Sequence, residues 1–327
     1  MKEWETRLTE LLNIRYPIIQ GGLAHLAYAD LAAAVCRAGG LGQLTAMTCQ
    51  SPEKLREEIK RLRSLTDHPF GVNFAIGQHG RPFQDFLNVA VEEEVPVVTI
   101  TGGNPTPVFD ALKGTAIKKL VLVSSRRQAI KAEALGADAV IAVGFEGGGH
   151  LGRDDVGGLV LIPQVVDAIN IPVVASGGIG DGRGLLAALA LGAEGIEMGT
   201  RFIATVECRH AHHAYKQRLL EANEMDTVVI KKTLGAPARA LRNAWTDQII
   251  SIEEQGGSYE DLQFYISGEA NRRFIHEGVF NEGFGWAGQV VGRIHDIPTV
   301  NELLGRIITE AENIQARLSV SLRGRHQ

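Results

Sequence analysis

One histidine in this chain follows an unusual run of glycines. An apolar segment, Ala139–Val143, leads into four glycines between positions 144 and 149, and His150 comes next. Glycine lets the backbone approach a ligand closely and adopt positive φ, at an entropic cost that plain connections avoid. A neutral imidazole can take a proton from a carbon acid or hydrogen-bond an anionic oxygen. The pattern therefore indicates that His150 is presented to a bound molecule, not left in an ordinary surface turn.

Two further glycine clusters follow strand-like segments downstream. The first contains Ser176, Gly177 and Gly178, and the second contains Gly199 and Thr200. Two successive strands that end in glycine, with a hydroxyl beside them, make a cradle of backbone N–H groups for a phosphate. In a (β/α)8 barrel the loops after strands seven and eight hold such a site. Residues 177–182 also fit part of a dinucleotide-binding motif, but their place past mid-chain argues against that interpretation.

The elements that must position these residues follow a regular βα rhythm. Short apolar runs rich in β-branched residues alternate with segments of helical period, the pattern of a parallel sheet built from βα units. The runs predict eight strands, at 18–20, 42–44, 71–74, 97–100, 119–123, 139–143, 173–175 and 195–198. Helices are predicted at 29–38, 52–64, 82–93, 105–113, 126–135, 159–169 and 182–191. The predicted fold class is α/β: a (β/α)8 TIM barrel with a smaller, mostly helical second domain.

The βα rhythm stops after Thr205. The following segment, to about residue 282, is richer in charge and in helical pattern. We therefore expect a ligand-binding barrel over 1–206, a helical substrate or lid domain over 207–299, and a C-terminal helix over 300–327. That helix carries one apolar stripe and is expected to return to the barrel; the stripe consists of Leu303, Leu304, Ile307, Ile308 and Ile314.

Composition fits a globular enzyme of the cytoplasm. The chain has 327 residues, of which 45% are hydrophobic and 22% charged. Its net charge is −5 and its Lys and Arg residues are scattered, so the sequence has no basic cluster that would indicate nucleic-acid binding. Three widely spaced cysteines fit neither a disulfide framework nor a zinc ribbon. The sequence shows no signal-peptide pattern and no apolar run of membrane-spanning length.

Other histidines carry weaker signals. His210, His212 and His213 lack the spacing and the partner ligands of a zinc site, so a solvated helix start is the favoured interpretation and no metal is predicted. His79 lies on a glycine-flanked loop and could line an entrance, and His25 lies on the loop after the first predicted strand.

Eight short motifs occur in order along nearly the whole chain. They are Gln20-Gly21-Gly22 and residues 38–42, 70–73, 103–105, 146–152, 176–178, 199–202 and 287–289. Together they resemble the nitronate monooxygenase family, formerly called 2-nitropropane dioxygenases. Relatives on the same scaffold include FMN-dependent enoyl-acyl-carrier-protein reductases and NADH:quinone reductases, and residues 152–163 are particularly similar to the quinone-reductase-like branch.

The resemblance implies an FMN site at the carboxyl ends of the strands. The phosphate is expected on the backbone of Gly178 and Gly199 with Thr200, and the isoalloxazine near the first loops, with His150 facing the substrate above it. The implied cofactor-binding residues are Gln20, Gly21, Gly22, Thr45, Ala46, Asn73, Gly149, Ser176, Gly177, Gly178, Gly199, Thr200 and Gln289.

The reaction that the resemblance implies is oxidative denitrification of alkyl nitronates with O2, carried by FMN. With NADH as reductant, the same pocket would reduce a quinone, or an enoyl thioester as a third choice. A non-redox barrel that binds a phosphorylated metabolite fits the glycine cradle alone. A homodimer is plausible on the apolar surface of the inserted segment.

Overall fold

The structure is a computed structural model that describes residues 4–77 and 82–322. Its centre is a parallel sheet of eight strands in the order β1-β9-β8-β6-β5-β4-β3-β2. Backbone hydrogen bonds from Leu41 N to Ile18 O and from Gln20 N to Leu41 O, both 2.9 Å, close the sheet into a barrel. The strands are β1 (Ile18–Gln20), β2 (Gln43–Thr45), β3 (Gly71–Ala75), β4 (Val97–Thr101), β5 (Lys118–Val123), β6 (Ala139–Val143), β8 (Val173–Ser176) and β9 (Gly195–Met198). The predicted (β/α)8 fold is confirmed.

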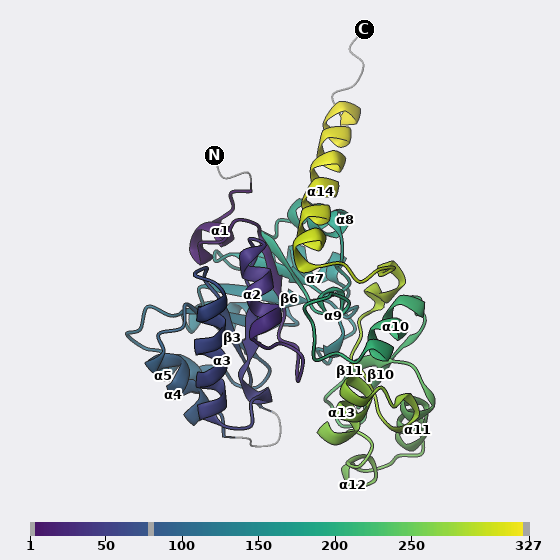
Figure 1. The fold of residues 1–327 in the computed structure, drawn as a ribbon. Coiled ribbons are helices and arrows are strands. Elements are labelled where there is room, and N and C mark those ends of the chain that lie inside the picture. The colour runs from purple at the N-terminus through teal and green to yellow at the C-terminus, as the bar shows by residue number, and fades with distance from the viewer. Residues whose placement is uncertain (1–3, 78–81, 323–327) are drawn as a thin grey trace.

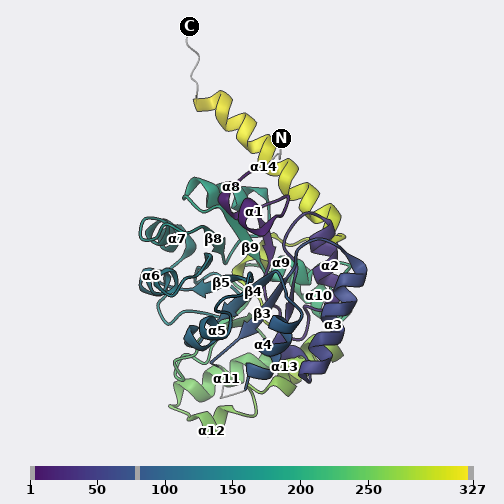
Figure 2. The ribbon, with the colours of Figure 1, turned by 90° about the vertical axis from the view of Figure 1, so that its left-hand side faces the viewer.

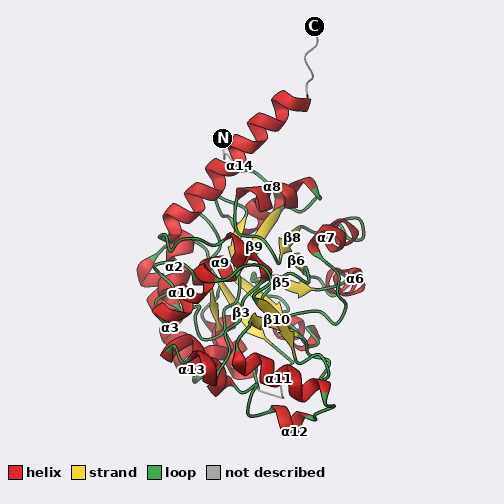
Figure 3. Cartoon of the chain, turned by 90° about the vertical axis from the view of Figure 1, so that its right-hand side faces the viewer, coloured by secondary structure: helices red, strands yellow, loops and turns green. Residues whose placement is uncertain are grey.

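Helices surround this barrel, as Figures 2 and 3 show. They are α1 (Arg7–Leu12), α2 (Ala29–Arg37), α3 (Pro52–Leu65), α4 (Gln84–Glu92), α5 (Thr106–Ala111), α6 (Arg126–Ala134), α7 (Gly158–Val166), α8 (Gly182–Ala190) and α9 (Thr200–Ile203). The eight strands and the seven predicted helices agree with the sequence predictions to within three residues at their ends, where frayed turns make boundaries indefinite. The helices α1 and α9 were not predicted.

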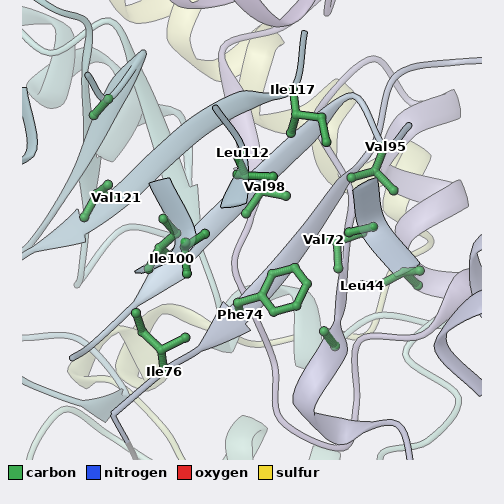
Figure 4. Packing of buried hydrophobic residues seen from close by; sticks show 14 of the residues in the cluster. Leu44, Val72, Phe74, Ile76, Val95, Val98, Ile100, Leu112, Ile117 and Val121 are labelled. Atoms are coloured by element: carbon green, nitrogen blue, oxygen red, sulfur yellow. The ribbon is translucent and has the colours of Figure 1, made fainter. Parts of the chain in front are cut away.

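Side-chain alternation along each strand separates an outer core from the barrel interior. On β3, Val72 and Phe74 pack outward against buried side chains of α3 and α4, and Figure 4 shows this layer. Each fully buried apolar side chain of this size contributes about 1.5–3 kcal/mol. The residue between them, Asn73, is consequently directed to the inside of the barrel.

The interior is apolar at one end and polar at the other. The apolar cluster includes Ile19, Leu120 and Ile141 from the strands and Leu8 from α1. Thr6, the cap of α1, donates to Glu194 O at 2.9 Å, which places α1 at the amino ends of the strands. Because α1 covers the amino ends of the strands, a binding site is expected at the opposite end of the barrel, where the carboxyl ends of the strands lie.

The chain after α9 forms a smaller body beside the barrel (Figure 1). Its helices are α10 (His213–Glu221), α11 (Ala244–Glu254), α12 (Tyr259–Leu262) and α13 (Gly268–Glu277), with short 3-10 turns η2 (Phe280–Glu282) and η3 (Gln289–Arg293). It also contains a three-stranded antiparallel sheet that the sequence analysis does not predict, made of β10 (Thr227–Ile230), β11 (Ala238–Leu241) and β7 (Gly149–His150). The third strand comes from the barrel loop that carries His150.

The last helix, α14 (Val300–Leu322), packs against α8 and α2. Of the predicted apolar stripe, Leu303, Leu304, Ile307 and Ile308 are buried and Ile314 is half-buried. The far end of α14 extends beyond the body of the molecule (Figure 1). No helix within residues 4–77 and 82–322 is long and apolar enough to cross a membrane.

Candidate active site

The glycine loops after β6 and β8 lie against each other at the carboxyl end of the barrel. Gly177 and Gly178 have φ of +91° and +74°, a backbone region that side chains with a Cβ rarely adopt. A Cβ on Gly177 would lie 2.8 Å from Gly144 O, and one on Gly178 would lie 3.1 Å from the Cβ of Glu146. Both positions therefore need glycine for conformation and for space.

The second wall of this cradle comes from distant parts of the chain. Gly199 precedes α9, and the Thr200 hydroxyl accepts a hydrogen bond from Gly288 N at 3.0 Å. Gln289 N donates to Glu146 O at 2.9 Å. The structure thus brings together Gly149, Gly177, Thr200 and Gln289, which the sequence analysis assigns to one site.

The first loops form the other side. A Cβ on Gly22 would overlap Oδ1 of Asn73, so the loop lies directly on that side chain. The Thr45 hydroxyl accepts from Leu23 N at 3.0 Å, and the buried Ala46 begins the 3-10 turn η1 (Ala46–Thr48). These contacts hold the Gly21–Gly22 backbone close to the end of the barrel.

The two amide side chains expected to contact a cofactor donate hydrogen bonds within the protein. Asn73 Nδ2 donates to the hydroxyls of Thr99 and Thr101, each at 2.9 Å. Gln20 is fully buried; its Nε2 donates to Gly21 O, and its Oε1 accepts from Gln43 N at 3.0 Å. Both side chains contact the Gly21–Gly22 loop from the barrel interior.

A buried carboxyl group that the sequence analysis misses lies between the two sides. Glu197, on β9, is 5% exposed, and its Oε2 accepts from the Ser176 hydroxyl at 2.9 Å. Its other oxygen, Oε1, has no hydrogen-bond partner, and a Cβ on Gly21 would lie 3.2 Å from the carboxyl carbon. Burial raises the pKa of Glu197 to about 7. The sequence signal was a single carboxylate at an inward-facing position of an apolar strand.

Replacing Glu197 by glutamine should stabilise the protein at alkaline pH. In the folded protein the pKa of Glu197 is about 7 against a usual 4.5, so the unfolded chain releases this proton first as pH rises. The wild type therefore loses stability between about pH 4.5 and 8, by about 3 kcal/mol, and Glu197→Gln avoids that loss. Urea unfolding of both proteins at pH 5 and pH 8 measures it. A stability difference that is the same at both pH values would contradict the assignment.

His150 lies in β7, over this end of the barrel. Its backbone pairs with Ala238 of β11. Its ring centroid is 5.7 Å from that of Trp286, and its Nε2 is 3.2 Å from Nζ of Lys231. The Trp286 backbone is itself fixed, because Tyr215 Oη donates to Trp286 O at 2.5 Å. Lys231 and Trp286 belong to the site's surroundings and were not singled out from the sequence.

The remaining histidines have separate places. His212 caps α10 and His213 begins it, which confirms the predicted helix start. His25 N donates to the Thr48 hydroxyl at 2.9 Å. His79 lies outside the described residues. In the part of the chain that the structure describes, no group of three or more His, Cys, Asp or Glu side chains could hold a metal ion.

A closed (β/α)8 barrel with glycine-lined loops and a histidine at its carboxyl end defines a TIM-barrel enzyme. The family model for nitronate monooxygenase matches residues 5–80 and 74–310. The chain belongs to this family of oxidoreductases. That membership favours redox chemistry over the non-redox phosphate-binding alternative.

Individual relatives agree with this assignment. A probable nitronate monooxygenase of Staphylococcus saprophyticus is 33% identical, and the match covers 95% of this chain and 99% of that protein. The structure of FabK from Thermotoga maritima has a TM-score of 0.91 and 41% identity, covering 97% and 99% of the two chains. That of a nitroalkane oxidase from Streptomyces ansochromogenes has a TM-score of 0.82 and 31% identity, covering 96% and 100%.

Proposed function

We propose that the protein is an FMN-dependent nitronate monooxygenase with His150 as its acid–base group. The observation that carries this proposal is the position of His150 on β7, beside the glycine loops at the carboxyl end of the barrel, in a chain of this family. The similarity to a protein named nitroalkane oxidase supports a nitroalkane or nitronate as substrate.

The site's own geometry fits FMN. At Gly177 and Gly178 the loop after β8 has backbone without side chains, held at positive φ against the loop after β6, and phosphate sites are commonly built from such backbone. On the opposite side, Glu197 presents a buried oxygen without a partner next to Gly21. Because its pKa is about 7, this carboxyl group carries a proton in much of the protein at neutral pH and can donate a hydrogen bond.

Each part of the cofactor has residues to hold it. The backbone of Gly178 and Gly199, with Thr200, would bind the phosphate. Gly21, Gly22, Thr45 and Ala46 would line the flat ring. The supporting residues are Gln20 and Asn73 beneath the loops, Ser176 and Gly177 at the end of β8, and Gly149 and Gln289 on the side of the smaller body.

FMN, when bound, supplies the redox chemistry. His150 handles the proton: its imidazole takes the proton from the α-carbon of a neutral nitroalkane, or hydrogen-bonds the oxygens of a nitronate. Trp286 supplies an apolar surface beside the imidazole of His150.

Anaerobic stopped-flow mixing tests the proposal. FMN-loaded protein mixed with propyl-2-nitronate should show rapid bleaching of the flavin absorbance, and readmitted O2 should restore it. The same protein mixed with NADH should bleach far more slowly. Bleaching by NADH alone would contradict the proposal and favour an NADH:quinone reductase, the second candidate, which the similarity of residues 152–163 supports. An enoyl thioester as electron acceptor ranks third.

A further inference from the structure

A lysine of the smaller body reaches the histidine of the barrel loop. Lys231 directly follows β10, and its Nζ lies 3.2 Å from Nε2 of His150. Eighty-one residues separate the two in sequence. The outer strands β10 and β7 both pair with β11, and Ile230 and His150 both lie opposite Ala238, so the contact lies at one end of the three-stranded sheet.

The backbone of Lys231 is held in a conformation that its side chain does not favour. Its φ is +63°, in the left-handed region where a Cβ causes strain. Its N–H donates to Oε2 of Glu253 at 2.9 Å, while Oε1 of the same carboxylate accepts from Thr233 N at 2.9 Å. Glu253 on α11 thus fixes the turn from which the Lys231 side chain leaves. A strained turn held by a buried carboxylate indicates that the direction of this side chain matters.

The ammonium group of Lys231 lies near an aromatic ring. Nζ lies 5.3 Å from the centroid of the Trp286 ring. Burial lowers the pKa of Lys231 to about 8, and the charge of Glu253 raises it in part. Two arginines of the neighbouring segments have other partners: Arg239 on β11 donates to Phe145 O and Thr227 Oγ1, and Arg153 donates to Gly235 O.

We propose that Lys231 is a positioning residue that fixes the ring of His150 and keeps it neutral. This inference rests on the acid–base role given to His150 in the proposed function. A charged ammonium has only hydrogens to offer, so it donates to an unprotonated Nε2. If Nε2 of His150 were also protonated, its N–H would point at the N–H groups of the Lys231 ammonium. Two positive charges would then lie side by side, which is unfavourable. While Lys231 is charged, Nε2 of His150 therefore stays unprotonated to lower pH than it otherwise would, and it takes the substrate's proton when the hydrogen bond from the ammonium group is released.

The matched substitutions are Lys231→Met, which keeps an unbranched stem and the Cβ but removes the charge, and Lys231→Arg, which keeps the charge. Lys232→Met is the control, because it removes the same charge from an exposed neighbouring side chain. All three keep a side chain at a position that already carries one, so none removes or adds a Cβ.

The measurement is a pH titration of the ring nitrogens of His150 by 15N NMR in FMN-loaded protein, with the signals assigned by their loss in His150→Gln. In wild type, Nε2 should be unprotonated at pH 7. In Lys231→Met the midpoint of His150 protonation should move to higher pH by about one unit. The acid limb of kcat/KM for nitroalkane should move with it, which lowers turnover about tenfold at pH values below the limb. Lys231→Arg and Lys232→Met should retain the wild-type midpoint.

An unchanged midpoint in Lys231→Met overturns the inference, whether or not the protein turns over nitronate. A shifted midpoint in a protein without nitronate turnover supports the pairing of Lys231 and His150 while the proposed function fails. A loss of folding in Lys231→Met is detected by its FMN affinity, and Lys231→Gln then replaces it in the same titration.

Discussion

Replacing His150 by alanine should lower turnover of a neutral nitroalkane by about 100- to 10,000-fold, the usual contribution of a general acid–base group. FMN binding should be retained, because the cradle of Gly177, Gly178 and Thr200 does not depend on the imidazole. Loss of activity on preformed nitronate should be much smaller, since that substrate has already lost its α-proton. Steady-state kinetics on both substrates, at a pH where the nitroalkane remains protonated, measure the difference.

His150→Gln is the matched variant, because it retains a hydrogen-bonding side chain without a titrating group. It should resemble alanine on nitroalkane and wild type on nitronate. Equal losses on both substrates would show that His150 binds the substrate and does not transfer the proton. Full activity of both variants would remove His150 from the mechanism.

Replacing Gly177 by alanine should abolish FMN binding. An alanine at φ +91° is strained by about 1–3 kcal/mol, and its Cβ would also lie 2.8 Å from Gly144 O. The loop after β6 and the loop after β8 must then separate, which displaces the backbone that is expected to bind the phosphate. We expect FMN affinity, measured by quenching of flavin fluorescence, to fall at least roughly 100-fold, equivalent to about 2.7 kcal/mol.

Gly136→Ala is the control that has the backbone strain of Gly177→Ala without its close contact. Gly136 has the same φ of +91°, but a Cβ there meets nothing within 4 Å. This variant should lose some stability and bind FMN as the wild type does. If the two alanine variants bind FMN equally well, the glycine loops after β6 and β8 are not the phosphate site.

The barrel was predictable because each βα unit has a recognisable hydrophobic pattern within its own stretch of sequence. Apolar strands such as β6 and amphipathic helices such as α3 have enough residues for their periods to be read. The glycines at 177 and 178 were also readable, since their type alone limits what the backbone can do there.

Side-chain partners across the fold were not predictable. The strand β7 has two residues, too few for any period, and it pairs with residues almost ninety positions away in sequence. For the same reason the sequence did not indicate that Lys231 would meet His150. The sequence placed Asn73 and Gln20 at the site, but it did not indicate that their amide donors bind Thr99, Thr101 and Gly21. The hydrogen-bond partner of a side-chain amide depends on the register between neighbouring strands. The hydrophobic periodicity of a sequence does not indicate that register.

The position of α14 has a consequence for synthesis of the chain. This helix fills the space between α8 and α2, yet it leaves the ribosome about a hundred residues after the last barrel strand. At 5–20 residues per second, the apolar surfaces of α8 and α2 stay uncovered for roughly 5–20 s. During that interval the nascent barrel exposes a hydrophobic groove of the kind that chaperones bind. Delays in translation between residues 207 and 299 should therefore increase aggregation of this protein more than delays before the barrel is made.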